Sequence, residues 1–172
     1  MKYILILFIP LLFFSCKKKF TQFYIDYNHE TTIPATVPVN SPVTLSTPEK
    51  QTNSTYRFES NDTRKDKIEK IILKDLVLTI TAPQSETFSF LNSIEVYIDS
   101  DNHPETKVAY KNNISEGIGN QLVCEVINTD LQKYIKEDAF TVKLVTVTDE
   151  VITQDIEVNI YSNFFVDAKL VK

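Results

Sequence analysis

The sequence predicts an all-β protein, an antiparallel β-sandwich of seven to nine strands with one or two short helices. First, several short segments alternate apolar and polar residues with a period of two, which is typical of strands with one buried face. Second, turn-forming residues recur between these segments at roughly ten-residue spacing. Third, the helical patches are too few and too short to supply the crossovers that a parallel sheet requires. With 172 residues, the chain suits one domain.

A proline-rich extended segment is assigned to residues 23–56. It opens with FYIDY at 23–27, which we interpret as an edge strand. Four prolines then interrupt the tract TTIPATVPVNSPVTLSTPEK, and each fixes φ and removes a donor, so no helix or central strand runs through it. Two arrangements stay open, namely short edge segments packed partly on the domain and a polyproline-like stalk. The apolar residues of the tract favour packing: Ile33, Val37, Val39, Val43 and Leu45.

The sandwich core is assigned to residues 57–172, and its first elements are a helix and a buried strand. Asn61 or Asp62 is expected to cap a helix that runs to Lys70. The next stretch, IILKDLVLTITAP, is apolar on both faces and therefore belongs inside a sheet. One face is expected to hold Ile72, Leu76, Leu78 and Ile80, and the other Ile71, Leu73 and Val77.

The rest of the chain reads as strands joined by turns. Ile94, Val96 and Ile98 alternate with polar residues, the turn-forming DSDNHPE follows, and KVAY returns as a strand. SEGIGNQ is a bend, LVCEVI is a strand, and NTDLQKYIKED is a short helix. Three strands are expected at the end, FTVKLVTVT, VITQDIEVNIY and FFVDAKLV. The short helix before FTVKL resembles the helical crossing between the sheets of immunoglobulin-like domains, although the chain has no tryptophan to complete their Cys…Trp…Cys signature.

Two groups of residues are candidate sites in this domain. Asp99, Asp101 and Glu105 place carboxylates in one loop, as a calcium site requires, but the spacing is not that of an EF-hand and a solvated hairpin turn explains them better. Phe88, Phe90 and Leu91 either plug the end of the sandwich or form an exposed partner surface, and plugging is the commoner outcome.

Catalytic motifs are missing from the sequence. The chain has two histidines, two glycines and no Gly-x-Ser-x-Gly, so neither a nucleophile with its base nor a glycine-rich phosphate loop is expected. Cys124, in QLVCEVI, is interpreted as a small core residue. We therefore predict no enzyme and no cofactor, and the formal net charge of −5 argues against nucleic acid.

The N-terminal segment predicts export. Residues 4–14 are apolar and follow a charged start, but this run is too short to span a bilayer. Phe13-Phe14-Ser15-Cys16 resembles a bacterial lipobox, although Leu or Val is commoner where Phe13 stands. The resemblance implies removal of residues 1–15, a diacylglycerol on the Cys16 sulfur and an acyl chain on its nitrogen. Residues 16–22 become a lipidated basic tether, with three lysines at the headgroups.

Two other interpretations of this segment are a buried N-terminal helix and an export signal cleaved without lipidation. The Lys-, Asn- and Ile-rich style, with a lysine run after the cysteine, resembles uncharacterised lipoproteins of Bacteroidota. A lysine directly after the cysteine resembles a signal for outer-membrane retention. We expect a non-catalytic, lipid-anchored cell-envelope protein that acts through protein contacts with an unidentified partner. The alternative is a surface lipoprotein that binds carbohydrate or calcium through loops 99–105 and 115–121.

Overall fold

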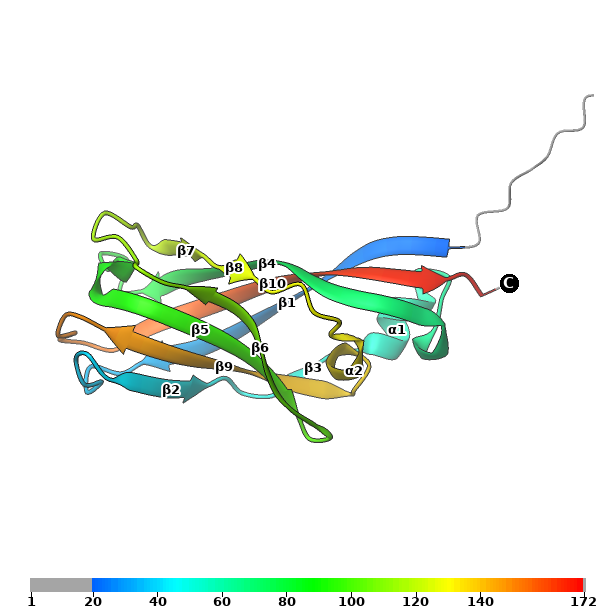
Figure 1. Cartoon of the computed structure of the whole chain (residues 1–172), viewed down its shortest axis with the longest axis horizontal. Coiled ribbons are helices and arrows are strands. Elements are labelled where there is room, and N and C mark those ends of the chain that lie inside the picture. Colours follow the sequence, from blue (N-terminus) through cyan, green and yellow to red (C-terminus); the bar gives the residue numbers. More distant parts are fainter. Residues whose placement is uncertain (1–19, 172) are drawn as a thin grey trace, which may run out of the picture.

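The computed structural model describes residues 20–171 and arranges them in two antiparallel sheets packed face to face (Figure 1). The four-stranded sheet has the order β1 (Phe20–Ile33), β10 (Ile156–Lys169), β4 (Ile68–Ala82) and β7 (Gln121–Val123). The other sheet has the order β2 (Pro42–Ser46), β9 (Ala139–Thr148), β5 (Leu91–Ser100), β6 (His103–Lys111) and β8 (Glu125–Val126), and β3 (Lys50–Gln51) pairs with β9. The helices are α1 (Ser54–Glu59), α2 (Gln132–Ile135) and the 3₁₀ turns η1 (Lys65–Lys67) and η2 (Phe88–Phe90).

The predicted all-β antiparallel sandwich with two short helices is therefore confirmed. The described residues form ten strands where seven to nine were expected. Two of the ten, β3 and β8, are only two residues long, too short to leave a periodic signal in the sequence.

The described part of the chain from residue 20 to residue 51 is part of the sandwich. β1 pairs with β10 along its whole length, from Phe20 opposite Lys169 to Ile33 opposite Ile156. β2 and β3 both pair with β9, and the prolines lie in the links or, for Pro42, at the start of an edge strand. The boundaries placed at residues 22/23 and 56/57 are therefore wrong, because the first falls inside β1 and the second inside α1.

The helix expected between residue 61 and Lys70 is also wrong. The chain is helical earlier, in α1, and from Ile68 onward it is strand β4. Asp62 has a φ of 56°, a left-handed conformation that a continuing helix does not allow. Thr63 is buried and donates from Oγ1 to the Lys169 carbonyl at 2.7 Å, which fixes the extended path into β4.

β4 is an inner strand, as predicted, but its faces differ from the predicted ones. Pairing with β10 is irregular at Lys74, because Leu73 lies opposite Phe164 and Asp75 lies opposite Asn163. This β-bulge shifts the side-chain alternation by one residue. Ile71 and Leu73 consequently point into the core together with Leu76, Leu78 and Ile80, whereas Ile72 lies on the outer face.

The two strands expected at the C-terminal end form one strand, β10. Ser162 and Asn163 do not interrupt it, because both fit the alternation of a strand. Ser162 points inward and donates from Oγ to the Tyr27 carbonyl at 3.4 Å, while Asn163 lies on the outer face and donates to Asp75 at 3.0 Å. Residues 151–155 form the loop before β10 instead of the first half of a strand.

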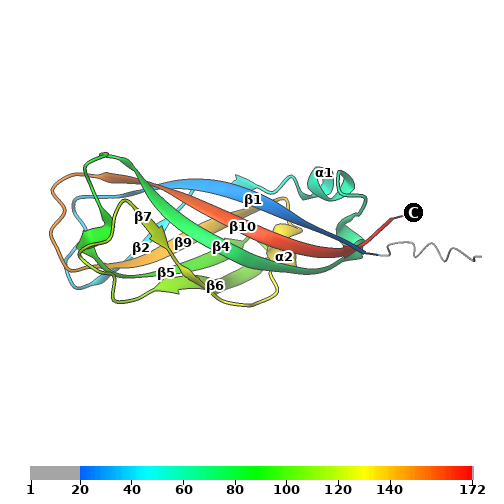
Figure 2. The same cartoon turned by 90° about the horizontal axis from the view of Figure 1, so that it is seen from above.

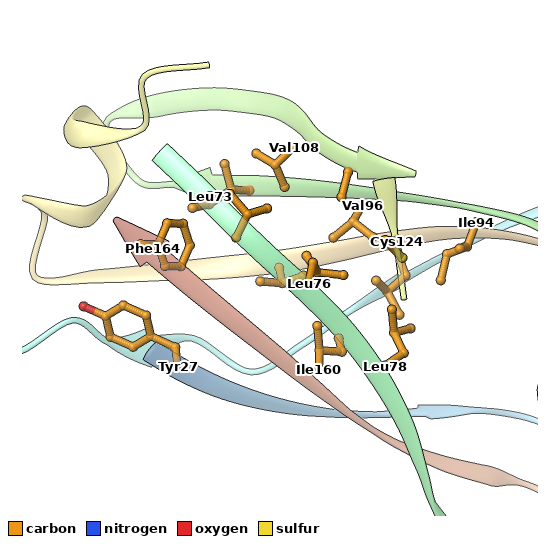
Figure 3. Close-up of a cluster of buried hydrophobic side chains, with 14 of the residues drawn as sticks. Tyr27, Leu73, Leu76, Leu78, Ile94, Val96, Val108, Cys124, Ile160 and Phe164 are labelled. Atoms are coloured by element: carbon orange, nitrogen blue, oxygen red, sulfur yellow. The ribbon is translucent and has the colours of Figure 1, made fainter. Parts of the chain in front are cut away.

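The expected strand LVCEVI divides at Cys124, where the chain passes from one sheet to the other. β7 pairs with β4 before this residue, and β8 pairs with β6 after it. The Cys124 N–H donates to the Leu76 carbonyl at 3.0 Å, and its side chain is 6% exposed. Figure 3 shows Cys124 among side chains of both sheets, with those of β4 and β10 facing those of β5 and β6: Leu73, Leu76, Leu78, Ile160, Phe164, Ile94, Val96 and Val108.

The two ends of the sandwich differ. β1 begins and β10 ends at the same end, next to α1 (Figures 1 and 2). The β9–β10 loop and the turn η2 lie at the opposite end. We call these the terminal end and the far end. The predicted short helix is confirmed as α2, and its residues Tyr134 and Ile135 are buried.

Candidate interaction surfaces

The carboxylates proposed as calcium ligands surround a lysine. Lys143, on β9, places Nζ 2.9 Å from Asp99 Oδ2 and 3.1 Å from Glu105 Oε2. Hydrogen bonds to Asp99 and then to Glu105 raise the pKa of Lys143, so the ammonium stays charged. Asp101 is exposed at the tip of the hairpin. Within residues 20–171, no three His, Cys, Asp or Glu side chains gather in a way that could hold a metal ion.

Phe88, Phe90 and Leu91 lie in the core, with exposed fractions of 0%, 3% and 0%. The idea that they form a partner surface is wrong, and their interpretation as a plug is confirmed. The turn η2 directs both phenylalanine rings inward, with centroids 6.3 Å apart. The Phe88 N–H donates to the Gly119 carbonyl at 3.1 Å, which ties this plug to the bend at residues 115–121.

Cysteine and histidine side chains most often perform nucleophilic or acid–base chemistry. Here Cys124 and His29 are buried, and His103 is paired with a carboxylate. Burial raises the pKa of the Cys124 thiol to about 12, so it is protonated at neutral pH. His29, on β1, is 3% exposed and packs its ring against Phe140 at 4.9 Å between centroids. His103 Nε2 lies 3.2 Å from Glu137 Oε1 on the surface. Among the described residues, the His29 ring is hydrogen-bonded to Thr47 and the His103 ring is paired with Glu137, so neither contact joins a histidine to the Cys124 thiol.

Ion pairs cover the outer face of the larger sheet. Glu95 accepts one hydrogen bond from Lys107 Nζ and one from the Tyr97 hydroxyl, both at 2.6 Å. Both bonds hold the pKa of Glu95 below its usual range, and the bond from Lys107 has the larger effect. Lys111 pairs with Glu125 at 3.5 Å on the same sheet. Surface pairs of this kind add little stability, but they leave few free charges on this face.

The outer face of the four-stranded sheet carries an apolar row. In the pairing register, Tyr161 of β10 lies opposite Val77 of β4, and Val77 lies opposite Val123 of β7. Their chain neighbours Ile160, Leu78 and Leu122 are buried, so these three side chains point outward, and Val123 is 63% exposed. We call Tyr161, Val77 and Val123 the outer apolar row.

This row was not identified from the sequence. The alternation in the sequence places Val77 on the face opposite Leu76 and Leu78. It does not show which strands lie beside β4, because that depends on pairing between segments far apart in the sequence. The outward residues that meet on the sheet are therefore known only from the structure. Among the described residues of this sheet, one ion pair joins two strands: Lys169 of β10 pairs with Glu69 of β4 at the terminal end.

The terminal end carries a second exposed apolar surface. Phe20 and Tyr24 project outward from β1 with exposed fractions of 46% and 60%, and Tyr56 of α1 is 75% exposed. Tyr24 packs edge-to-face against Phe165 of β10 at 5.5 Å between centroids. Tyr24, Tyr56 and Arg57 also line one open depression of about 430 Å³. We call Phe20, Tyr24, Tyr56 and Phe165 the terminal aromatic patch.

Two other structural facts concern the N-terminal prediction. Cys16 and the apolar run before it lie outside the described residues, so the structure does not place the proposed lipid site. Within the part that is described, no helix has both the length and the apolar character needed to cross a bilayer.

Comparison with known proteins gives no family. Neither a protein-family model nor a curated protein matches the chain. A solved structure from Desmodium yellow mottle tymovirus aligns with 88% of this chain and 90% of its own, at 9% sequence identity and a TM-score of 0.25. A TM-score of that size supports no inference about fold or function.

Proposed function

We propose that this protein is a non-catalytic lipoprotein of the bacterial cell envelope that is anchored at Cys16, retained at the outer membrane and active through protein contacts. The anchor rests on the sequence, namely an apolar run that ends in Phe-Ser-Cys and is followed by three lysines. The fold is compatible with it, because strand β1 starts only four residues after Cys16.

The absence of catalysis is supported by what the reactive side chains do. The Cys124 thiol sits where the chain changes sheets, and His29 packs inside the sandwich. Lys143 neutralises two of the acids in the most acidic hairpin. Cys124 and His29 are thus buried, and Lys143 occupies the carboxylates of Asp99 and Glu105.

The observation that carries the proposed protein contact is the outer apolar row. Tyrosine and aliphatic side chains aligned across three strands form a surface that excludes water readily on contact. Amides flank the row, since Asn159 donates to Asn28 at 3.1 Å and Asn163 donates to Asp75 at 3.0 Å. An apolar centre with a polar surround is the usual composition of a protein–protein interface.

The Cys16→Ser variant tests the anchor. A hydroxyl does not accept the diacylglycerol, so the variant is expected to lose membrane attachment or to remain unprocessed with its signal peptide. Fractionation of cells, with the mass of the purified protein, measures both results. The control is Cys124→Ser, which removes the buried thiol and leaves the anchor in place. A Cys16→Ser protein that is processed and stays in the membrane fraction would contradict the lipid anchor.

The Val123→Lys variant tests the contact surface. Cross-linking of the anchored protein in envelopes, followed by affinity capture, is expected to return one defined partner for the wild type. Val123→Lys introduces a charge into the outer apolar row and should reduce that capture at least tenfold, while the fold is kept because the side chain is 63% exposed.

The matched control is Val151→Lys in the β9–β10 loop, where the valine is 75% exposed and is not part of the row. This variant should capture the partner as the wild type does. Equal capture by all three proteins would mean that the outer apolar row is not the contact surface.

A further inference from the structure

We propose that the terminal end of the sandwich lies directly against the membrane, with the terminal aromatic patch among the lipid headgroups. This inference rests on the proposed lipid anchor at Cys16. It adds an orientation: the long axis of the sandwich stands away from the bilayer, and the far end is the part most remote from it.

The first argument is the length of chain available. Four Cα–Cα steps join Cys16 to Phe20, and a fully extended chain spans at most about 3.6 Å per residue, so these atoms lie within about 14 Å of each other. Phe20 is already fixed in the sheet, opposite Lys169. A lipid on Cys16 therefore holds the terminal end close to the headgroup layer, whose thickness is itself about 5–8 Å on each side of a bilayer.

The second argument is what this end exposes. Seven large hydrophobic side chains are exposed among the described residues, and the three aromatic ones are all in the terminal aromatic patch: Phe20, Tyr24 and Tyr56. Val171, 37% exposed, lies at the same end, because its N–H donates to the Asp62 carbonyl at 2.9 Å just after α1. Tyrosine is enriched at membrane–water interfaces, where its ring meets acyl chains and its hydroxyl meets water.

The third argument concerns charge. Several acids at the terminal end are paired with bases, since Glu69 pairs with Lys169 and Asp66 pairs with both Arg64 and Lys67. These pairs reduce repulsion from an anionic surface. The three lysines that follow Cys16 add positive charge next to this end, and positive charge is attracted to an anionic membrane surface.

Fluorescence quenching by lipid measures the orientation. The Tyr56→Cys and Val151→Cys variants each receive a bimane label on the new thiol, and both replaced side chains are 75% exposed in the wild type. Cys124 is not labelled under native conditions, because its thiol is buried and has a pKa of about 12, and Cys16 carries the lipid. The lipidated proteins are inserted into phosphatidylethanolamine–phosphatidylglycerol vesicles that contain lipids with a nitroxide on the headgroup.

Quenching at position 56 is expected to exceed quenching at position 151 at least fivefold. Adding Phe20→Ser and Tyr24→Ser to the Tyr56→Cys protein should reduce the quenching at position 56, because the apolar contact with the interface is lost. Equal quenching at positions 56 and 151 would overturn the docking. So would a label at position 56 that is shielded from aqueous iodide but not quenched by lipid, since that result means that a protein covers the patch.

The outcome for the anchor is scored separately. Mass spectrometry reports the lipid on Cys16, and flotation reports attachment to the vesicles. A protein without lipid that fails to float contradicts the lipid anchor itself. A lipidated protein that floats but shows equal quenching contradicts the docking alone.

Discussion

Replacing Phe140 with alanine is expected to lower the free energy of unfolding by about 3–5 kcal/mol, a large part of the stability of a domain of this size. Phe140 lies on β9 and is 1% exposed. Its ring makes edge-to-face contacts with Tyr27 at 5.1 Å, His29 at 4.9 Å and Phe164 at 6.4 Å. The substitution leaves a cavity between the two sheets, and β-strands held on both sides collapse only slightly into it.

The control for this prediction is Phe20→Ala, which removes the same side chain from an exposed position. Phe20 is 46% exposed, so its loss should cost less than about 1 kcal/mol. Urea unfolding of the two variants and the wild type gives all three values with one method. A Phe140→Ala protein as stable as Phe20→Ala would mean that the ring cluster does not hold the sheets together.

Sequence reasoning predicted the sandwich because its strongest signals are local. The alternation around Ile94, Val96 and Ile98 in β5 predicts a strand with one buried face, and that strand is present. The reasoning failed where a contact between distant segments decides the local structure. The bulge at Lys74 depends on pairing with β10, and the helix expected at residue 62 is prevented by a turn that the Lys169 carbonyl stabilises through Thr63.

The candidate surfaces were less predictable than the fold. Phe88 and Phe90 are typical of either a plug or a patch, and only the packing of η2 decides between them. The outer apolar row joins residues of β10, β4 and β7, and the terminal aromatic patch joins β1, α1 and β10. Single outward side chains on separate strands become a surface only when the sheet order is known, and the sequence does not give that order.

The anchor and the two surfaces imply a division of the molecule. The terminal end faces the proposed membrane, the outer apolar row lies on one side of the sandwich, and ion pairs cover the larger sheet on the other side. A partner that binds the row would therefore approach parallel to the bilayer, and another envelope protein can do so without leaving the membrane.

The stability of the protein is expected to fall by about 3 kcal/mol as the pH drops from 6.5 to 4, because of His29. Burial first, and the nearby Lys50 ammonium second, lower the pKa of His29 from 6.5 to about 4. Between these values the unfolded chain binds a proton on His29 and the folded protein does not. Stability therefore rises with pH across this window, and the contribution of His29 is fully present above about pH 6.5.

The contacts of the ring explain why the folded protein resists this proton. Thr47 Oγ1 accepts from the Val142 N–H at 3.1 Å and lies 3.3 Å from His29 Nδ1, in a hydrogen bond whose direction depends on the tautomer of the ring. The other ring nitrogen, Nε2, is buried and has no hydrogen-bond partner among the described residues. Protonation makes both ring nitrogens donors, so it would leave an N–H at Nε2 without an acceptor and place a positive charge between Phe140 and Lys50.

Urea unfolding between pH 4 and pH 8 tests this, with His29→Leu as the variant. Leucine does not titrate, so the variant should lose the part of the pH dependence that belongs to His29, whatever its absolute stability. His103→Gln is the matched control, because it removes a histidine that is 31% exposed and leaves His29 in place, so a loss of slope that belongs to the buried ring is larger in His29→Leu than in this variant. If His29→Leu and the wild type show the same slope between pH 4 and 6.5, the acid sensitivity belongs to other groups, and the buried histidine titrates alike in the folded and unfolded chains.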